Sequence, residues 1–345
     1  MDRPALDAFA TRQRLPAPAI AAALQLTGLQ PDLPAWRRFA ANMLRAAGLG
    51  ALGAGVLFFV AANWQDYGVL GRFALLQCGL LACVAMALWR APPASVGQAA
   101  LVLATLLTGG LLALFGQSYQ TGADLHELFF TWALLALPFA LAGWSGALWA
   151  VWCCVLNVAL ALLCGWLAPE HFAWRFIAGW GVARPTLLML PCALNLLAAG
   201  AFLMLRRTRF AAAAPVWLPR LLASLGFAYG TGAVLVLIVD RFWLDDEIHQ
   251  GQEGIAVLLF FAAVSAAIAI ATWLARRDVF PMALIAASWI AISTTWLARV
   301  LRFDDIGVFF VIASWLIAAS TATGLLLMHW VRAWRDTPAS EGAAA

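Results

Sequence analysis

The feature that most constrains this chain is a series of long apolar runs that follow one another along its 345 residues. A helix that crosses a bilayer core of about 30 Å needs about 20 apolar residues. Ten runs of about that length occur, with ends uncertain by a few residues. The predicted spans are 44–63, 72–90, 96–115, 128–144, 146–167, 185–205, 220–239, 255–275, 279–297 and 306–330.

Composition leads to the same fold class. The chain is 64% hydrophobic and 11% charged, whereas soluble domains are about half apolar and a quarter charged. Several Trp residues stand at predicted span ends, where indole rings favour the headgroup zone. The sequence therefore predicts an all-α fold, a polytopic transmembrane helix bundle of about ten spans.

The arginines predict the orientation. All 21 basic residues are arginine, and most of them fall in the N-terminal segment and in the alternate loops that share its side. Basic residues concentrate in cytoplasmic loops, so both termini are predicted to be cytoplasmic. The acidic segment 240–254 then lies outside and the basic loop 206–220 inside. We expect a multi-pass protein of the bacterial inner membrane.

Four regions follow from these boundaries. Residues 1–42 are predicted to form a cytoplasmic helical arm of two or three short helices, divided by prolines such as Pro18 and Pro34. Residues 43–168 and 169–331 form two transmembrane halves, and 332–345 a disordered cytoplasmic tail. Both halves contain a Gly-rich span that ends near a Trp, which leaves an internal duplication open.

Motif searches give no catalytic site. Gly48 to Gly53 matches G-x-G-x-x-G, but the match lies inside the first predicted span, without the strand that a dinucleotide-binding turn requires. Its glycines predict close helix packing instead. Hydrolase, Walker and zinc-protease motifs are missing, and the six cysteines lie in apolar runs as small hydrophobic residues. We predict no enzymatic activity, no catalytic residues and no cofactor.

The predicted spans carry no charge near their centres, which weakens the case for ion-coupled transport. Their deep polar residues are uncharged, and hydrogen bonds between helices would explain them without a substrate. Pro138 and Pro191 fall in mid-span and are expected to kink their helices. The deep polar residues are Gln77, Asn157, Asn195, Tyr229, Thr231 and the run 293–295.

The outer face carries the candidate site. The first span ends in a polar cluster, and Arg72 is close enough to Asp66 in the sequence to pair with it. The loop 116–127 on the same predicted face contains no Arg or Lys. The candidate polar outer cluster consists of Asn63, Trp64, Asp66, Arg72, Gln117, Tyr119 and Asp124. It is a binding site if these groups meet, and a helix exit with interfacial anchors if they point apart.

Three histidines, His126, His171 and His249, also lie on the predicted outer face near carboxylates. Imidazole and carboxylate are common metal ligands. No two of these histidines have helical i, i+4 spacing, and acidic outer loops follow from the topology alone. We therefore predict no metal site.

Several of these signals together resemble a known family. A helical N-terminal segment precedes Trp36, the first span ends at Asn63 and Trp64, and Arg72 opens the second span. Gly116 to Gln120, Asp124, Trp132 and Pro138 follow in order. Over residues 5–170 the chain resembles the bacterial membrane proteins catalogued as domain of unknown function 2157. The resemblance implies a class of membrane protein and no mechanism.

Three hypotheses about function remain open. The first is a non-catalytic inner-membrane protein whose outer polar face binds a partner or an envelope component. The second is a transporter or channel for a small molecule. The third is a sensor or scaffold that acts through the N-terminal arm. The predicted partners are the lipid bilayer and a membrane or periplasmic protein, and no nucleic acid.

Overall fold

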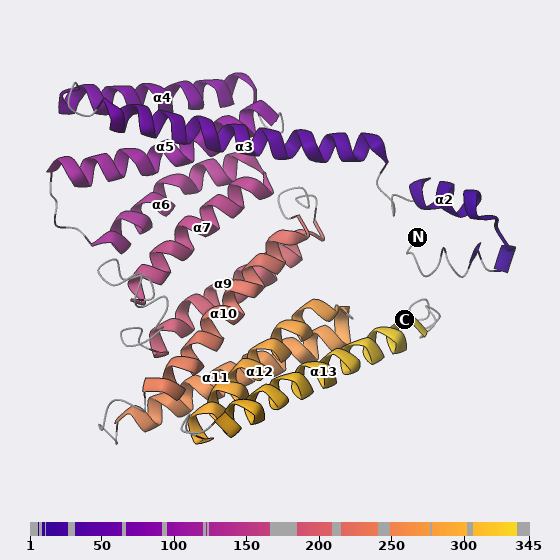
Figure 1. The fold of residues 1–345 in the computed structure, drawn as a ribbon. Coiled ribbons are helices and arrows are strands. Elements are labelled where there is room, and N and C mark those ends of the chain that lie inside the picture. The colour runs from indigo at the N-terminus through magenta and orange to yellow at the C-terminus, as the bar shows by residue number, and fades with distance from the viewer. Residues whose placement is uncertain are drawn as a thin grey trace. The chain divides into compact units, whose positions relative to one another are not determined.

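In the computed structural model the described part of the chain is predominantly helical. The described residues are 6, 9–10, 12–26, 32–63, 67–91, 95–119, 122, 124–165, 185–208, 215–240, 249–276, 278–301 and 306–336. They form helices and their connecting turns and contain no strand (Figure 1). The predicted all-α fold is confirmed.

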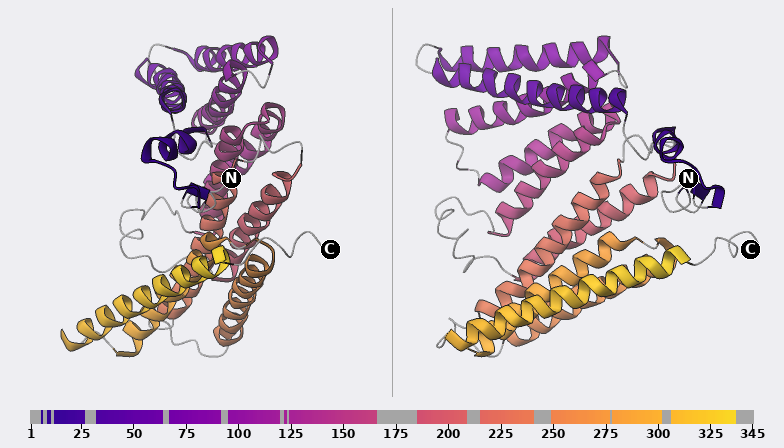
Figure 2. Two further views of the ribbon diagram at one scale, coloured as in Figure 1. Left: turned by 90° about the vertical axis from the view of Figure 1, so that its right-hand side faces the viewer. Right: turned by 45° about the vertical axis from the view of Figure 1, so that its right-hand side comes forward.

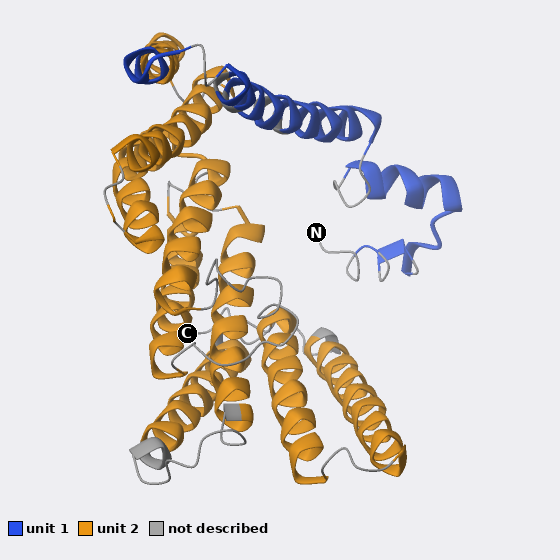
Figure 3. Cartoon of the chain, turned by 60° about the vertical axis from the view of Figure 1, so that its left-hand side comes forward, with its two compact units in different colours: residues 1–74, 335–345 blue, residues 75–334 orange. Residues whose placement is uncertain are grey.

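The residues divide into two compact units, coloured separately in Figure 3. One unit comprises residues 1–74 and 335–345, and the other residues 75–334. The first contains α2 (Ala17–Leu26), α3 (Leu33–Ala62) and the first residues of α4 (Val69–Trp89). The second contains the rest of α4 and the helices that follow it.

The second unit is an up-and-down bundle in which consecutive helices run antiparallel (Figure 2). Contacts are most extensive between α9 and α10, and α10 also packs on α11 and α12. At the other side of this unit α6 lies between α5 and α7. Its remaining elements are α5 (Ser95–Tyr119), α6 (Leu125–Gly143), α7 (Gly146–Leu163), α9 (Pro185–Leu205), α10 (Trp217–Asp240), α11 (His249–Ala271), the π-helix η3 (Thr272–Arg276), α12 (Val279–Leu301) and α13 (Ile306–Asp336).

Nine helices in the described part of the chain are long and apolar enough to cross a bilayer. They correspond to the second through the tenth predicted spans. The first predicted span, 44–63, occupies the C-terminal part of α3, a helix of 30 residues. The chain is thus a polytopic membrane protein with about ten spans.

The N-terminal arm contains a break between helices next to Pro34, since α2 ends at Leu26 and α3 begins at Leu33. Pro34 itself lies in the first turn of α3. Proline lacks an N–H group, and the first turn of a helix does not use that group. Asp32 caps the turn by accepting a hydrogen bond from the Ala35 N–H at 2.8 Å. From Leu33 onward, the arm continues without a break into the first span.

The C-terminal helix also runs further than predicted. α13 continues through residues 332–336, where a disordered tail was expected. Residues 337–345 lie outside the described part of the chain.

Two local features of the second unit follow from the sequence. The tight turn at Gly143 to Gly146 forms with Trp144 in the left-handed region, and the Ser145 hydroxyl caps α7. Both α6 and α9 continue through their internal prolines. Pro191 cannot donate to the Leu187 carbonyl four residues earlier. The Cys164 thiol donates to that carbonyl at 3.6 Å, so a neighbouring helix satisfies the group that proline leaves open.

Close packing at glycine occurs at positions that the sequence did not single out. A side chain at Gly109 would overlap the ring of Trp132, and one at Gly230 would overlap the ring of Phe261. The stripe predicted to pack closely behaves differently. A Cβ at Gly48, Gly50 or Gly55 meets no described atom within 4 Å. Gly53 of the same stripe is buried, so open space surrounds three of its four glycines.

The cysteines fit their predicted role only in part. Cys83, Cys153, Cys164 and Cys192 are buried, as expected for small hydrophobic residues. Cys78 and Cys154 are exposed. Both lie within membrane-spanning helices, so their side chains face away from the protein interior.

Candidate functional site

The first part of the candidate cluster lies where α3 ends and α4 begins. Asn63 is the C-terminal cap of α3, and its side-chain amide donates to the Phe59 carbonyl at 2.8 Å. Arg72 lies in the first turn of α4 and is half-buried. Trp64 and Asp66 lie outside the described residues, so their predicted roles stay predictions. Asn63 thus has a structural task, which is to close the last turn of its helix.

The second part of the cluster lies where α5 ends and α6 begins. Tyr119 is the last residue of α5, and its ring packs on that of Phe115 with centroids 4.9 Å apart. Asp124 occupies the N-cap position of α6, but its side chain makes no capping hydrogen bond. Its carboxylate lies 4.0 Å from the His126 ring nitrogen Nδ1. Both Tyr119 and Asp124 are exposed.

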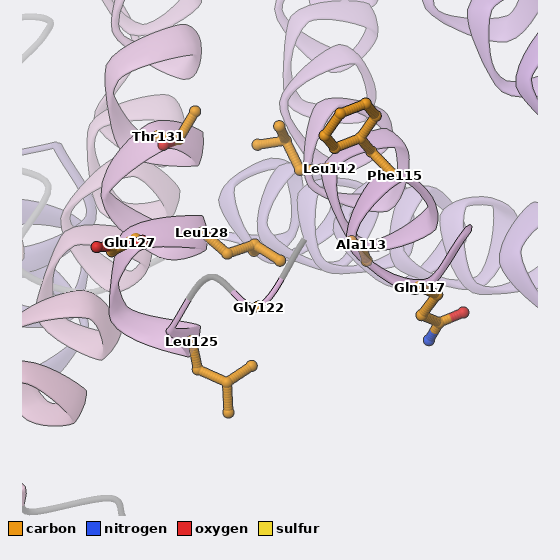
Figure 4. A pocket seen from close by; sticks show the side chains of 10 residues that line it. Leu112, Ala113, Phe115, Gln117, Gly122, Leu125, Glu127, Leu128 and Thr131 are labelled. Carbon is orange, nitrogen blue, oxygen red and sulfur yellow. The ribbon is translucent and has the colours of Figure 1, made fainter. Parts of the chain in front are cut away.

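A cavity of about 500 Å³ opens between these two helix ends. Figure 4 shows Leu128 extending from α6 toward α5. The side chains of Gln117 and Leu125, near the ends of these helices, point downward in the same view. The lining is apolar apart from Gln117, Thr131 and Glu127. The other lining residues are Leu112, Ala113, Phe115, Gly116, Gly122, Leu125 and Leu128. This combination of an apolar pocket with a few polar groups is typical of ligand sites.

The charge around this cavity is negative in the described residues. Glu127 lines it and Asp124 lies three residues away on the same helix end, whereas no Arg or Lys lines it. Glu127 in the first turn of α6 is also favoured by the helix dipole, so its presence does not by itself indicate a ligand. An apolar cavity next to two carboxylates suits an apolar group attached to a positive charge.

The two parts of the cluster belong to different compact units. Asn63 and Arg72 are in the first unit, and Gln117, Tyr119 and Asp124 are in the second. Within the second unit, the structure brings Gln117, Tyr119 and Asp124 to the same pair of helix ends. The predicted meeting of Asn63 with Tyr119 and Asp124 stays a prediction.

The deep polar residues form a second polar region, which is closed. Asn157 in α7 and Asn195 in α9 exchange hydrogen bonds through their side-chain amides, at 2.8 and 3.1 Å. Each amide also donates to a carbonyl of its own helix. The Tyr229 hydroxyl of α10 donates to the Asn157 carbonyl at 3.1 Å. The predicted hydrogen bonding between helices is confirmed for these three residues.

Other deep polar residues do not follow that prediction. Gln77 is exposed on α4. The hydroxyls of Thr231 and Thr294 are buried without a hydrogen-bond partner among the described residues. Ser293 does follow it, because its hydroxyl accepts from the Trp315 indole of α13 at 3.3 Å.

The sequence did not reveal one contact that supports the cavity. The Trp132 indole of α6 donates to the Thr105 carbonyl of α5 at 2.8 Å, and its ring lies over Gly109. This contact fixes the spacing of the two helices whose ends form the cavity. The sequence shows a Trp on α6 and a Gly on α5. It does not show that they face each other, because that depends on the register of the two helices.

No metal site emerges in the described part of the chain. No three His, Cys, Asp or Glu side chains there lie close enough to hold an ion. The carboxylate of Asp124 lies 4.0 Å from His126, whose ring also packs edge-on against Phe130. His171 and residues 245–247 lie outside the described residues, and so does the side chain of His249.

The comparison with known families supports the resemblance seen in the sequence. Residues 7–149 match the model of a family described as "Predicted membrane protein (DUF2157)". The match includes both parts of the candidate cluster and the α5–α6 cavity. No curated protein and no solved structure matches the chain. Residues 7–149 of the chain are therefore similar to the DUF2157 family of predicted membrane proteins.

Proposed function

We propose that this protein is a non-catalytic protein of the bacterial inner membrane, which binds a partner protein through the α5–α6 cavity. The observation that carries the proposal is the cavity itself, an apolar pocket of about 500 Å³ beside Glu127 and the exposed Asp124. The expected occupant is an extracytoplasmic segment of a membrane or periplasmic protein. It would insert an apolar side chain and place a basic residue next to the carboxylates.

The sidedness of this proposal rests on the arginine distribution. With cytoplasmic termini, the ends of odd-numbered spans lie outside, and α5 is the third span. The cavity then faces the periplasm, where an envelope partner is accessible.

The deep polar region supports this proposal over transport. A transport path needs polar groups that can exchange bonds with a substrate. Asn157, Asn195 and Tyr229 instead bond to one another and to backbone carbonyls, inside a core that includes Leu188, Cys192 and Phe261. Their hydrogen bonds explain their presence in the membrane without a substrate.

A photo-crosslinking residue at Tyr119 tests the proposal in living cells. Tyr119 is exposed and lies two residues after Gln117, which lines the cavity, and we expect a discrete adduct with one membrane or periplasmic protein. Glu127→Arg should reduce that adduct strongly, since it reverses the charge in the cavity. The control is the same residue at Leu134, which is also exposed on α6 but does not line the cavity.

Two results would reject the proposal. One is an adduct whose yield is the same from Leu134 as from Tyr119. The other is an adduct from Tyr119 that Glu127→Arg leaves unchanged. Enzymatic turnover by the purified protein would reject its non-catalytic part.

A role as a sensor is the second candidate, and it is favoured by the continuity of α3. This helix carries the arm residues 33–42 and the first span without interruption, so a force on the arm acts on the span. Ala40→Pro would break the helix between them, because proline removes a backbone hydrogen bond and clashes with the preceding turn. Loss of the function of the gene, with the bundle still inserted and folded, is the expected result for a sensor.

A further inference from the structure

A second cavity, of about 760 Å³, lies between α10, α11 and α12. It shares no lining residue with the α5–α6 cavity. Most of its lining is apolar, and the polar side chains are Ser293 and Arg299. The full lining is Val234, Leu237, Ile238, Gly254, Ile255, Leu258, Trp289, Ile292, Ser293, Trp296, Arg299 and Val300.

Arg299 is the charged group of this cavity. It lies two residues before the end of α12 and is partly buried. Its guanidinium donates to the Ile238 carbonyl in the last turn of α10. A cation is favoured at this position, because the C-terminus of a helix carries a partial negative charge. The hydrogen bond to Ile238 uses one of the five N–H groups of the arginine.

The remaining donors of Arg299 have no carboxylate partner among the described residues. A cation held at the wall of an apolar cavity attracts an anion. Arg is the side chain best matched to phosphate, because its planar fork forms two parallel hydrogen bonds with it.

The rest of the lining suits a hydrocarbon chain. Ile255, Leu258, Trp296 and Val300 line the cavity and remain exposed. They belong to membrane-spanning helices, so the surface they expose is covered by lipid. Trp rings are favoured at the level of the headgroups, which places Trp296 and Arg299 near the same depth. The cavity thus has an anion-binding end and an apolar wall that is open to the bilayer.

We propose that this cavity binds one anionic phospholipid of the bilayer, with its phosphate on Arg299 and an acyl chain along Ile255, Leu258 and Trp296. Ser293 lies on the cavity wall, and the Trp315 indole of α13 already donates to its hydroxyl. The lipid would therefore contact three helices directly and a fourth through this bond. The site is independent of the proposed partner binding at α5–α6.

Native mass spectrometry of the full-length protein tests this site, with phosphatidylglycerol and phosphatidylcholine added separately. We expect one phosphatidylglycerol per chain to be retained in preference to phosphatidylcholine. Arg299→Gln should lower that retention about tenfold, since a charge-assisted hydrogen bond is lost. Arg299→Lys should retain an intermediate amount, because it keeps the charge and loses the fork.

The controls separate loss of the site from loss of the fold. Arg90→Gln removes an arginine that lies over Trp89 at the end of α4, and it should leave retention unchanged. Gly254→Leu fills the cavity and keeps Arg299, so it should lower retention as well. Gly324→Leu is its control, because a Cβ there meets nothing within 4 Å.

Three outcomes would overturn the proposal. The first is equal retention of phosphatidylglycerol by the wild type, Arg299→Gln and Gly254→Leu. The second is equal retention of both lipids by the wild type. The third is displacement of the bound lipid by inorganic phosphate at equal concentration, which would show that the anion alone is recognised.

Discussion

The two polar regions of the second unit differ in their surroundings: one is closed and hydrogen-bonded, and the other lines an open cavity. At the junction of α7, α9 and α10, Asn157, Asn195 and Tyr229 bond to one another and to backbone carbonyls. At the ends of α5 and α6, Gln117 and Glu127 line an open cavity. A polar group without a hydrogen-bond partner costs much free energy inside a bilayer and little at its edge, where water can bond to it.

The difference indicates where this protein can bind something. The deep polar groups stabilise the bundle, and substitutions there should lower stability. The polar groups at the helix ends contribute little to stability, and substitutions there should change binding alone. Each of the following predictions tests one side of this contrast.

The largest loss of stability is expected at a glycine that an aromatic ring contacts closely. Gly230→Val places a branched side chain in the space of the Phe261 ring, next to the deep polar region. Overpacking of this kind costs about 1–3 kcal/mol, and we expect the upper end because Phe261 is fully buried. Unfolding in mixed micelles, followed by circular dichroism, measures the loss. Gly324→Val is the control and should leave stability unchanged.

Removal of one amide of the deep pair should be the next most damaging change. Asn195→Leu leaves the Asn157 side-chain oxygen without its donor, at a cost of about 1–3 kcal/mol. In Asn157→Leu/Asn195→Leu both polar groups are gone. The double variant should therefore lose less stability than the sum of the two single variants, by about 0.6–1.7 kcal/mol. Strict additivity would show that the two amides do not depend on each other.

A smaller effect is expected at the contact between α5 and α6. Trp132→Phe keeps an aromatic ring over Gly109 but removes the hydrogen bond to the Thr105 carbonyl. The loss should be about 0.6 kcal/mol, the average for a hydrogen bond between membrane helices. The same unfolding titration measures it. Trp334→Phe is a control, because that indole packs edge-on against Trp273 and donates no hydrogen bond among the described residues. A loss as large as that of Asn195→Leu would mean that α5 and α6 depend on this bond.

Much of the fold was predictable because a bilayer imposes strict requirements on sequence. Each span must be long and apolar, so the runs at 96–115 and 185–205 mark helices directly. The deep amides were also correctly interpreted, since Asn157 and Asn195 have few other partners in an apolar bundle.

Other features were not predictable because they depend on how the helices face one another. The Gly109–Trp132 and Gly230–Phe261 contacts require the rotation of each helix about its axis, which spacing along the chain does not give. A break between helices was expected near Pro34, but the sequence did not show that α3 then runs from the arm through the first span as one helix. In the candidate cluster, Gln117, Tyr119 and Asp124 lie at the same pair of helix ends, as their proximity in the sequence indicated, and that they form a binding site stays a prediction.

The smallest effect on stability, and the one that best separates the two regions, is expected at Glu127. Glu127→Gln keeps the size of the side chain and removes the charge that lines the α5–α6 cavity. An exposed carboxylate in the first turn of a helix contributes about 0.3–1 kcal/mol, so the free energy of unfolding should change by no more than that. The photo-crosslink from Tyr119 should nevertheless weaken, since the partner loses the charge it faces. Gln117→Leu, which removes an amide and no charge, should weaken it less. A large loss of stability with an unchanged crosslink would mean that Glu127 supports the fold, and the contrast between the two regions would not hold.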